Sequence, residues 1–379
     1  MKKLIIYFLS IISIIRIFFI NNQKKNKKII LFYFPIKIYQ KNLIDLIINL
    51  KENYKVILIY NLNSKQQIEK IKDSYFFDFF YAKFIPFHKI FLSKINFFIS
   101  SYISYVYPPN SKNIYISHDI YDAPMINQKL ERNLILRMST LDYIFASSEL
   151  SKKYLESKIK KVHKKSYTKI INTGYLKLDH LIKKIKQNKK GNSILIAPGY
   201  SLNYKDHNIY EYLEKIIINI LDNTKKKIIF RPHPLDLTKK GNPLLINGLI
   251  KKFNKYKNFS CNLTPSYINE FNKSEILITD LTSTAYTFAF STLKPVIFFS
   301  KSEALLQKSN DSKLKFFLDR KKVGSIINKV DRIIPEINYL LKNKNIYKNK
   351  IRKLRKKRIE YFNISSKKTL NTLDNIFKH

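Results

Sequence analysis

Residues 276–299, ILITDLTSTAYTFAFSTLKPVIFF, contain two short apolar runs separated by a hydroxyl-rich turn and a longer apolar stretch. The runs 276–279 and 295–299 are rich in Ile, Val and Phe, which is typical of buried strands. Residues 283–292 between them are long enough for a helix of about three turns. A strand, a helix and a second strand in this order predict a βαβ unit with parallel strands.

The same alternation extends in both directions along the chain. The sequence predicts further strands of this series at 194–197, 227–230 and 259–262, with helices at 210–221, 244–253 and 267–273. An earlier series has strands at 29–34, 56–60, 76–80, 97–102, 113–117 and 143–147, with helices at 43–51 and 129–139. Strands that alternate with helices form parallel sheets with both faces covered. We therefore predict an α/β fold with two Rossmann-like domains.

The lysine-rich residues 183–191 separate the two series and are expected to be exposed. We place the N-terminal domain at 23–185 and the C-terminal domain at 192–340. A hydrophobic segment at 1–22 and a basic helical segment at 341–379 lie outside both. Ligands of such sheets bind beyond the carboxyl ends of the strands, so the residues directly after each strand are the candidates for function.

The chain is strongly basic, with 71 Lys and Arg against 27 Asp and Glu and a formal net charge of +44. Such a charge attracts polyanions, namely nucleic acid, anionic lipid or a phosphate-bearing polymer. The codon bias of an AT-rich genome would produce part of this charge without any partner. Nucleic acid is not the expected partner, because the sequence has no Arg-rich or RNP-like signature. The single cysteine, Cys261, excludes an internal disulfide framework and a zinc site built from cysteines.

Residues 4–20, LIIYFLSIISIIRIFFI, lie between lysine-rich flanks and indicate association with an anionic membrane surface. This run contains Arg16 and is at the short limit for spanning a bilayer, so it either spans the membrane or lies on it. A first helix or strand of a soluble fold is the alternative, and a signal peptide is disfavoured because no small-residue cleavage site follows. Residues 348–358, KNKIRKLRKKR, form either a solvated helical face or a surface for anionic lipid or polymer.

Arg231 and His233 follow the predicted strand 227–230, within the sequence IIFRPHP at residues 228–234. The two prolines stop the strand and make the turn rigid. A guanidinium and an imidazole are both natural partners of phosphate oxygens. We interpret this turn as a phosphate-binding candidate, and a turn with an incidental histidine is the alternative.

Asp280 ends the strand 276–279, and Thr282, Ser283 and Thr284 follow at the start of the helix. A helix N-terminus offers free backbone N–H groups and the positive end of the helix dipole, and these hydroxyls add further donors. Plain N-capping is the alternative. The glycines of a P-loop or a dinucleotide fingerprint are missing, so neither motif is assigned. We predict that Asp280 and the three hydroxyl residues bind a phosphate.

His118 leaves the strand 113–117, and Asp119 and Asp122 follow closely. An imidazole oriented by a carboxylate is suited to act as a general base. These three residues are candidate catalytic groups, and a surface histidine with a structural role is the alternative. Neither His118 nor His233 has the spacing of a metal site, and we expect no bound metal or other cofactor.

Several segments, in the same order along the chain, resemble the CDP-glycerol glycerophosphotransferase family, GT-B-fold enzymes that build teichoic-acid-like polymers. The matching segments are Ala197-Pro198, Arg231-Pro232-His233, Thr279-Asp280-Leu281-Thr282-Ser283 and Lys294-Pro295-Val296-Ile297-Phe298. A Thr-Gly-Tyr segment followed by an acidic residue, which the family has between its domains, corresponds to Thr173-Gly174-Tyr175 and Asp179.

The resemblance implies a GT-B fold, in which an N-terminal acceptor domain and a C-terminal nucleotide-donor domain face a central cleft. In that family the Arg-Pro-His histidine and a Ser-Ser pair contact the donor diphosphate, and these roles fall here on His233, Thr282 and Ser283. His118 is the positional match of the proposed base. The implied activity is an inverting, metal-independent transfer of glycerol phosphate, or a related polyol phosphate, from a CDP-linked donor. The implied acceptor is lipid-linked or a surface polymer, at the cytoplasmic face of the cell membrane.

Three departures from the family pattern leave other functions open. The Gly-Thr-Pro after the base is Asp119-Ile120-Tyr121-Asp122-Ala123-Pro124 here, Thr-Trp-Arg after Ala-Pro is Gly199-Tyr200-Ser201, and an acidic residue of the phosphate helix is Thr287. One alternative is a GT-B glycosyltransferase that uses a CMP- or UDP-activated sugar, as the polysialyl- and Kdo-transferases do. Others are a UDP-sugar epimerase and a non-catalytic basic protein that binds membranes or nucleic acid.

Overall fold

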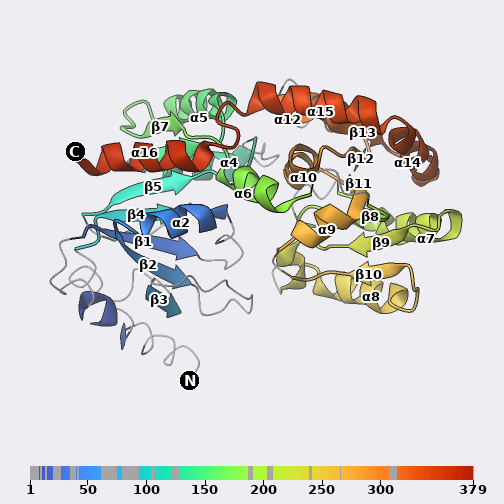
Figure 1. The fold of residues 1–379 in the computed structure, drawn as a ribbon, viewed down its shortest axis with the longest axis horizontal. Helices are drawn as coiled ribbons and strands as arrows, with labels where there is room; N and C mark the ends of the chain where they lie inside the picture. Colours follow the sequence, from blue (N-terminus) through green and yellow to red (C-terminus); the bar gives the residue numbers. More distant parts are fainter. Residues whose placement is uncertain are drawn as a thin grey trace. The chain divides into compact units, whose positions relative to one another are not determined.

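The computed structural model describes residues 8, 11–12, 15–19, 27–34, 40, 42–60, 75–78, 94–103, 107–108, 110–121, 128–186, 191–202, 208–238, 241–264, 266–304, 306 and 314–378. These residues form two compact units. Unit 1 contains the described residues up to 121, from 128 to 179 and from 359 onward, and unit 2 contains those from 180 to 358. Each unit is an α/β structure (Figure 1). The predicted cleft between the two domains stays a prediction.

Unit 1 is built on a seven-stranded sheet with the strand order β3-β2-β1-β4-β5-β6-β7. Its strands are β1 (Ile29–Phe34), β2 (Lys55–Tyr60), β3 (Tyr75–Asp78), β4 (Phe97–Ser100), β5 (Lys112–Ile116), β6 (Tyr143–Ala146) and β7 (Lys169–Asn172). All neighbouring pairs are parallel. Its helices are α2 (Ile44–Leu50), α4 (Gln128–Met138), α5 (Glu149–Val162) and α16 (Ser365–Lys378). The helix α6 (Leu176–Lys184) leads from unit 1 into unit 2.

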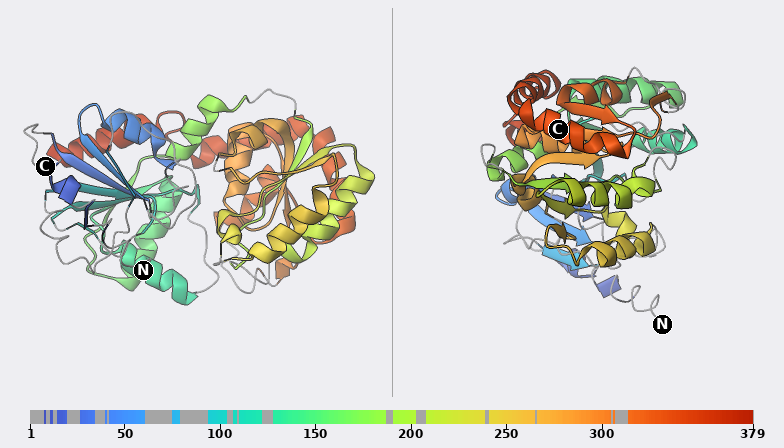
Figure 2. Two further views of the ribbon diagram at one scale, coloured as in Figure 1. Left: turned by 90° about the horizontal axis from the view of Figure 1, so that it is seen from below. Right: turned by 90° about the vertical axis from the view of Figure 1, so that its right-hand side faces the viewer.

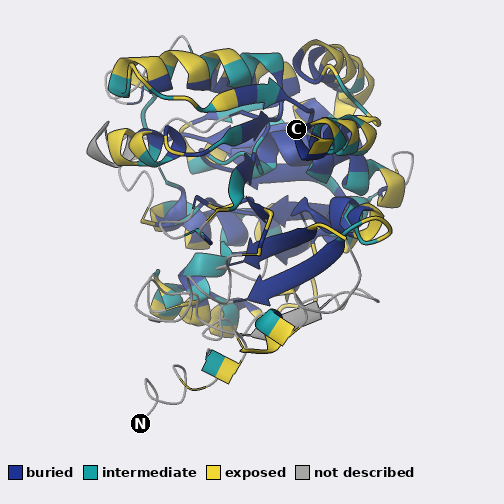
Figure 3. Cartoon of the chain, turned by 90° about the vertical axis from the view of Figure 1, so that its left-hand side faces the viewer, coloured by how far each residue is buried: buried dark blue, intermediate teal, exposed yellow. Residues whose placement is uncertain are grey.

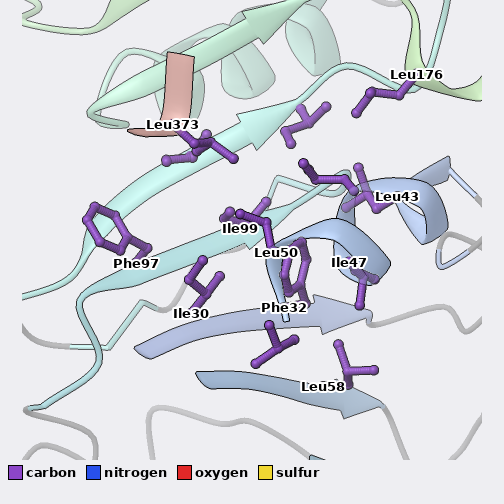
Figure 4. Close-up of a cluster of buried hydrophobic side chains, with 14 of the residues drawn as sticks. Ile30, Phe32, Leu43, Ile47, Leu50, Leu58, Phe97, Ile99, Leu176 and Leu373 are labelled. Atoms are coloured by element: carbon purple, nitrogen blue, oxygen red, sulfur yellow. The ribbon is translucent and has the colours of Figure 1, made fainter. Parts of the chain in front are cut away.

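The strands of unit 1 are apolar on both faces because helices cover both. Every residue of β1 and of β2 is buried. On one face, Ile30 and Phe32 of β1 pack in a cluster with Ile47 of α2 and Leu373 of α16 (Figure 4). On the other face, separate clusters include side chains of α4 and α5. Figure 3 shows the strands as the buried layer, with exposed residues on the outer helix surfaces.

The described part of residues 1–22 packs partly against unit 1. Ile17 is completely buried in a cluster with Leu31 of β1 and Ile57 of β2. Phe8 and Phe19 are each 64% exposed. No helix among the described residues is both long enough and apolar enough to cross a membrane.

Unit 2 is built on a six-stranded parallel sheet with the order β10-β9-β8-β11-β12-β13. Its strands are β8 (Ser193–Ile196), β9 (Lys227–Phe230), β10 (Phe259–Cys261), β11 (Ser274–Thr279), β12 (Val296–Phe299) and β13 (Gly324–Ile327). Its helices are η2 (Tyr210–Tyr212), α7 (Leu213–Asn223), η3 (Pro234–Leu237), α8 (Pro243–Phe253), α9 (Ile268–Lys273), α10 (Thr284–Thr292), α12 (Lys315–Leu318), α13 (Arg320–Val323), η4 (Val330–Arg332), α14 (Ile333–Lys342) and α15 (Lys344–Arg358). Helices flank both faces of this sheet (Figure 2).

The C-terminal residues 341–379, which we expected to form one basic segment, are divided between the two units. The helix α15 belongs to unit 2, where Arg355 donates to the carbonyl oxygen of Phe290 at 2.6 Å and Arg358 pairs with Asp319 at 2.7 Å. The helix α16 belongs to unit 1 and packs on α2. The inner face of α15 is thus anchored through two buried arginines.

Candidate functional site

The strand order of unit 2 brings the predicted phosphate-binding segments together. The strands β9, β8 and β11 are neighbours and run parallel, so their carboxyl ends lie at the same edge of the sheet. Residues 231–233 follow β9, residues 197–201 follow β8, and residues 280–284 follow β11. This edge is where ligands of open α/β sheets bind, so we take it as the candidate site.

His233 is held in a defined orientation within this edge. Its Nδ1 accepts a hydrogen bond from the backbone N–H of Leu235 at 3.2 Å, so the neutral imidazole carries its proton on Nε2. The ring of Tyr200 lies beside it, with the ring centroids 5.4 Å apart. Pro234 starts the short helix η3 directly after His233. The half-buried imidazole can therefore donate from Nε2 to an anion such as a phosphate oxygen.

Thr282, Ser283 and Thr284 are half-buried at the N-terminus of α10, as expected. Ser283 is the N-cap residue, but its side chain makes no capping bond to the helix. All residues of α10 after Thr284 are buried, so packing anchors the helix and directs its positive end toward these hydroxyls. The Thr284 N–H is bonded to Thr282 Oγ1 at 3.3 Å, and the Ala285 N–H is bonded to the Thr282 carbonyl oxygen at 3.2 Å. The N-terminus of α10 can therefore hold an anion mainly through its hydroxyls and the positive end of the helix dipole.

Asp280, the third element of the predicted phosphate site, is a buried carboxyl that bonds to backbone groups. It is 3% exposed, and its Oδ1 and Oδ2 accept hydrogen bonds from the backbone N–H groups of Gly199 at 2.8 Å and Ile209 at 3.2 Å. Burial raises the pKa of this carboxyl to about 6, although these hydrogen bonds oppose the rise. Both carboxylate oxygens are used within unit 2, and a carboxylate repels phosphate. Asp280 thus holds the loop after β8, and the expected contact with the donor phosphate stays a prediction.

Asp236 is a second buried carboxylate that the sequence did not single out. It is completely buried, and it accepts hydrogen bonds from the backbone N–H of Ser201 at 3.1 Å and from the Ser201 hydroxyl. The Tyr210 hydroxyl lies 2.5 Å from Asp236 Oδ2 and 2.9 Å from the carbonyl oxygen of Gly199. These contacts fix the loop that carries Tyr200. The only sequence signal for Asp236 was its position three residues after His233.

Arg231 extends toward the loop after β10. Its Nη2 donates to the carbonyl oxygen of Thr264 at 2.6 Å, and its Nη1 donates to Asn262 Oδ1 at 3.4 Å. The guanidinium also lies 5.7 Å from the centre of the Tyr267 ring. Burial lowers the pKa of Arg231. Two of its N–H groups are engaged within unit 2, and the direct phosphate contact expected of Arg231 stays a prediction.

The candidate base lies in unit 1, directly after β5. His118 and Asp119 are neighbours in space, with Nε2 3.6 Å from Asp119 Oδ2. The Tyr115 hydroxyl lies 3.3 Å from Nδ1 on the other side of the imidazole. The side chains of His118 and Asp119 are 28% and 23% exposed, so a substrate can reach them. Asp122, the third predicted catalytic residue, lies outside the described residues.

The described residues contain no group of three or more His, Cys, Asp or Glu side chains that could hold a metal ion. The candidate anion-binding groups in unit 2 are an imidazole N–H, hydroxyls and a helix N-terminus. Among the predicted catalytic residues of unit 1, His118 is the candidate proton acceptor.

Comparison with known proteins shows the same architecture in enzymes of polymer synthesis. The family model for CDP-glycerol:poly(glycerophosphate) glycerophosphotransferase matches residues 15–378. The minor teichoic acid biosynthesis protein GgaB of Bacillus subtilis (strain 168) is 30% identical over 163 residues, which are 41% of this chain and only 16% of GgaB.

Solved structures match over most or all of the chain. The wall teichoic acid polymerase TagF superposes with a TM-score of 0.64 at 17% identity, covering 100% of this chain and 97% of that one. A TagF variant soaked with CDPG gives a TM-score of 0.65 at 17% identity and the same coverage. The UDP-GlcNAc 2-epimerase of Methanocaldococcus jannaschii, in complex with UDP-GlcNAc and UDP, gives 0.54 at 14% identity, with 83% and 92% covered. These likenesses establish the fold.

Proposed function

Because the chain belongs to the CDP-glycerol:poly(glycerophosphate) glycerophosphotransferase family, we propose that it transfers glycerol phosphate, or a related polyol phosphate, from a CDP-linked donor. The acceptor is a hydroxyl group of a growing teichoic-acid-type polymer. The observation that carries the proposal is the edge of unit 2 where His233 follows β9 and the N-terminus of α10 follows β11, on either side of β8. Both groups donate hydrogen bonds to anions and suit the diphosphate of such a donor.

In this proposal unit 2 binds the donor. His233 donates from Nε2 to a diphosphate oxygen, and Thr282, Ser283 and Thr284 donate from their hydroxyl groups at the start of α10. The stabilisation that these groups provide increases as negative charge develops on the leaving nucleotide. Donors already held in place need no reorganisation at that moment. The soaked TagF variant supports the choice of a CDP-linked donor, since its fold matches this chain.

Unit 1 supplies the base. His118 takes the proton of the acceptor hydroxyl, and Asp119 stabilises the imidazolium that forms. The acceptor oxygen attacks the phosphorus that carries the glycerol, in line with the departing group. A new phosphorus–oxygen bond forms as the bond from that phosphorus to the bridging oxygen breaks. CMP leaves with the electron pair, and the polymer gains one phosphodiester-linked unit. In-line attack inverts the configuration at phosphorus. In this proposal His233 and the hydroxyls at the start of α10, rather than a metal ion, stabilise the charge of the leaving group.

The proposal extends to a membrane-linked acceptor at the cytoplasmic face of the cell membrane. The exposed Phe8 and Phe19, and the net charge of +44, support it. An apolar surface beside many cations suits an anionic bilayer. The test is sedimentation with phosphatidylglycerol vesicles, with phosphatidylcholine vesicles as the comparison. Equal recovery in the supernatant with both would refute the membrane part alone.

The test of the transfer reaction is the release of CMP from CDP-glycerol and CDP-ribitol in the presence of a glycerol phosphate primer. His233→Ala and His118→Ala should each lose activity. The control is His163→Ala, which should keep it: His163 lies directly after α5, and its Nδ1 is hydrogen-bonded to the Ser139 hydroxyl. CMP- and UDP-linked sugars are included as competing donors. Turnover of those sugars alone, or wild-type rates in both the His233 and His118 variants, would overturn the proposed function.

A further inference from the structure

We propose that Tyr175, Ser117 and Ser147 are positioning residues for His118, and this inference rests on the proposed function of His118 as base. The three side chains hold the loop that carries the imidazole by binding three successive backbone carbonyls. The Tyr175 hydroxyl donates to the carbonyl oxygen of His118 at 2.9 Å. The Ser117 hydroxyl donates to Asp119 O at 3.2 Å, and the Ser147 hydroxyl donates to Ile120 O at 3.0 Å.

The three donors come from three neighbouring strands. Ser117 follows β5, Ser147 follows β6, and Tyr175 lies just after β7, and these strands are adjacent in the sheet. Tyr175 is completely buried, Ser147 is 1% exposed, and Ser117 is 6% exposed. Because the donors themselves are packed in the unit, they can act as fixed points for the loop.

Gly174 places the Tyr175 side chain. Its φ is +86°, a left-handed conformation that favours glycine, and a Cβ there would meet the Ser365 side chain. The backbone N–H of Gly174 is held by Asn172 Oδ1 at 3.1 Å. Asp179, further along, accepts from the backbone N–H groups of Asn363 at 2.9 Å and Ser365 at 2.7 Å. The Thr-Gly-Tyr segment thus combines a tight turn with a buried hydroxyl directed at the candidate base.

These three hydrogen bonds, which we call the clamp, act on the backbone of the loop and not on the imidazole itself. Tyr115 and Asp119 lie beside the two ring nitrogens of His118. The clamp instead fixes the position of the backbone from which the His118 side chain extends. A general base must lie within about 3 Å of the proton that it takes. A misplacement of about 1 Å can cost a factor of about a hundred in rate. Losing one of the three bonds should therefore lower kcat and leave donor binding in unit 2 unchanged.

The experiment uses the full chain and three variants. Tyr175→Phe removes one hydroxyl and keeps the ring, Ser117→Ala removes a second donor, and Ser117→Thr keeps that donor. We expect Tyr175→Phe and Ser117→Ala to lower kcat about tenfold, with the KM for CDP-glycerol unchanged, and Ser117→Thr to restore most of the rate. The matched control is Tyr54→Phe, which loses a hydrogen bond to Asp374 at the amino end of β2. It should lower stability without lowering kcat.

A second readout does not depend on turnover. Amide hydrogen exchange across residues 117–121 should accelerate in Tyr175→Phe, while exchange in unit 2 stays unchanged. The rate at which diethylpyrocarbonate modifies His118 should also differ between Tyr175→Phe and the wild type. The modification rates of His163 and His180 serve as internal references and should stay the same. Unchanged exchange and modification in Tyr175→Phe would overturn the clamp, and so would a loosened loop with an unchanged kcat. If the wild-type protein turns over no CDP-linked donor, the proposed function fails, and these two measurements still decide whether the hydroxyls hold the loop.

Discussion

The backbone N–H of Leu235 donates to Nδ1 of His233 at 3.2 Å. A nitrogen that accepts this bond carries no proton, so the neutral imidazole must present an N–H at Nε2. The backbone of Leu235, in the short helix η3, therefore sets which atom of His233 can contact an anion. An imidazole fixed in this way can donate to a phosphate oxygen in its neutral form.

His233→Ala should lower kcat for CMP release by about a hundredfold or more, since removing one fixed donor to a developing charge costs a few kcal/mol. His233→Gln places an amide N–H near the position of Nε2 and should retain more activity than His233→Asn, whose shorter amide lies near Nδ1. Steady-state kinetics with CDP-glycerol checks this order. Equal rates for the Gln and Asn variants would contradict the assigned tautomer.

Asp236→Asn should destabilise unit 2 and weaken donor binding. Asp236 Oδ2 accepts from the Ser201 N–H and the Tyr210 hydroxyl, and Oδ1 accepts from the Ser201 hydroxyl. The NH₂ of Asn replaces one of these oxygens and cannot accept, so at least one of the three donors loses its partner. The loss of buried acceptors costs about 1–3 kcal/mol for each unsatisfied group. Calorimetry, with and without CDP-glycerol, measures both effects. The matched control is Asp222→Asn, an exposed residue of α7 that should leave both unchanged.

The raised pKa of Asp280 makes folding stability depend on pH in a defined direction. Its pKa rises from 3.8 to about 6 on folding because burial penalises the charged form. The folded state therefore binds more protons than the unfolded state between these two values, and the free energy of unfolding falls as the pH rises through that range. The effect amounts to about 3 kcal/mol in total. Above about pH 6 this contribution stays constant.

Urea denaturation of the wild type and of Asp280→Asn from pH 4 to pH 7 checks this prediction. The free energy of unfolding of the wild type, minus that of the variant, should decrease across this window. A difference that is flat, or that increases with pH, would show that folding does not raise the pKa of this carboxyl.

Removal of divalent cations should leave the transfer reaction intact. In the proposed mechanism His233 and the N-terminus of α10 provide the charge stabilisation that a metal ion provides in other phosphoryl transfers. Assays of CMP release after dialysis against EDTA should therefore give at least half of the untreated rate. A loss of more than tenfold that Mg²⁺ or Mn²⁺ restores would contradict the metal-independent step.

The apolar pattern predicted eleven of the thirteen strands of the two sheets, several with their observed ends. The two strands that it missed are β7 and β13, whose sequences KIIN and GSII contain only two apolar residues each. These segments become strands because β6 and β12 offer edges whose backbone groups need partners. The need arises only after the rest of each sheet has formed, so no local pattern can show it.

At the candidate site, the chain itself determined which residues follow strands. His233, the hydroxyls 282–284 and His118 stand at such positions, and the order of apolar runs and turns was enough to find them. Tertiary structure decided what each side chain faces. Asp280 follows a strand as His233 does, yet its carboxylate is buried. There it accepts hydrogen bonds from the backbone N–H groups of Gly199 and Ile209. Tyr175 bonds to His118 across 57 residues of sequence, since β5, β6 and β7 are neighbours only in the folded sheet. Periodicity records which residues avoid water, whereas the partner of a buried polar group depends on which strands lie side by side.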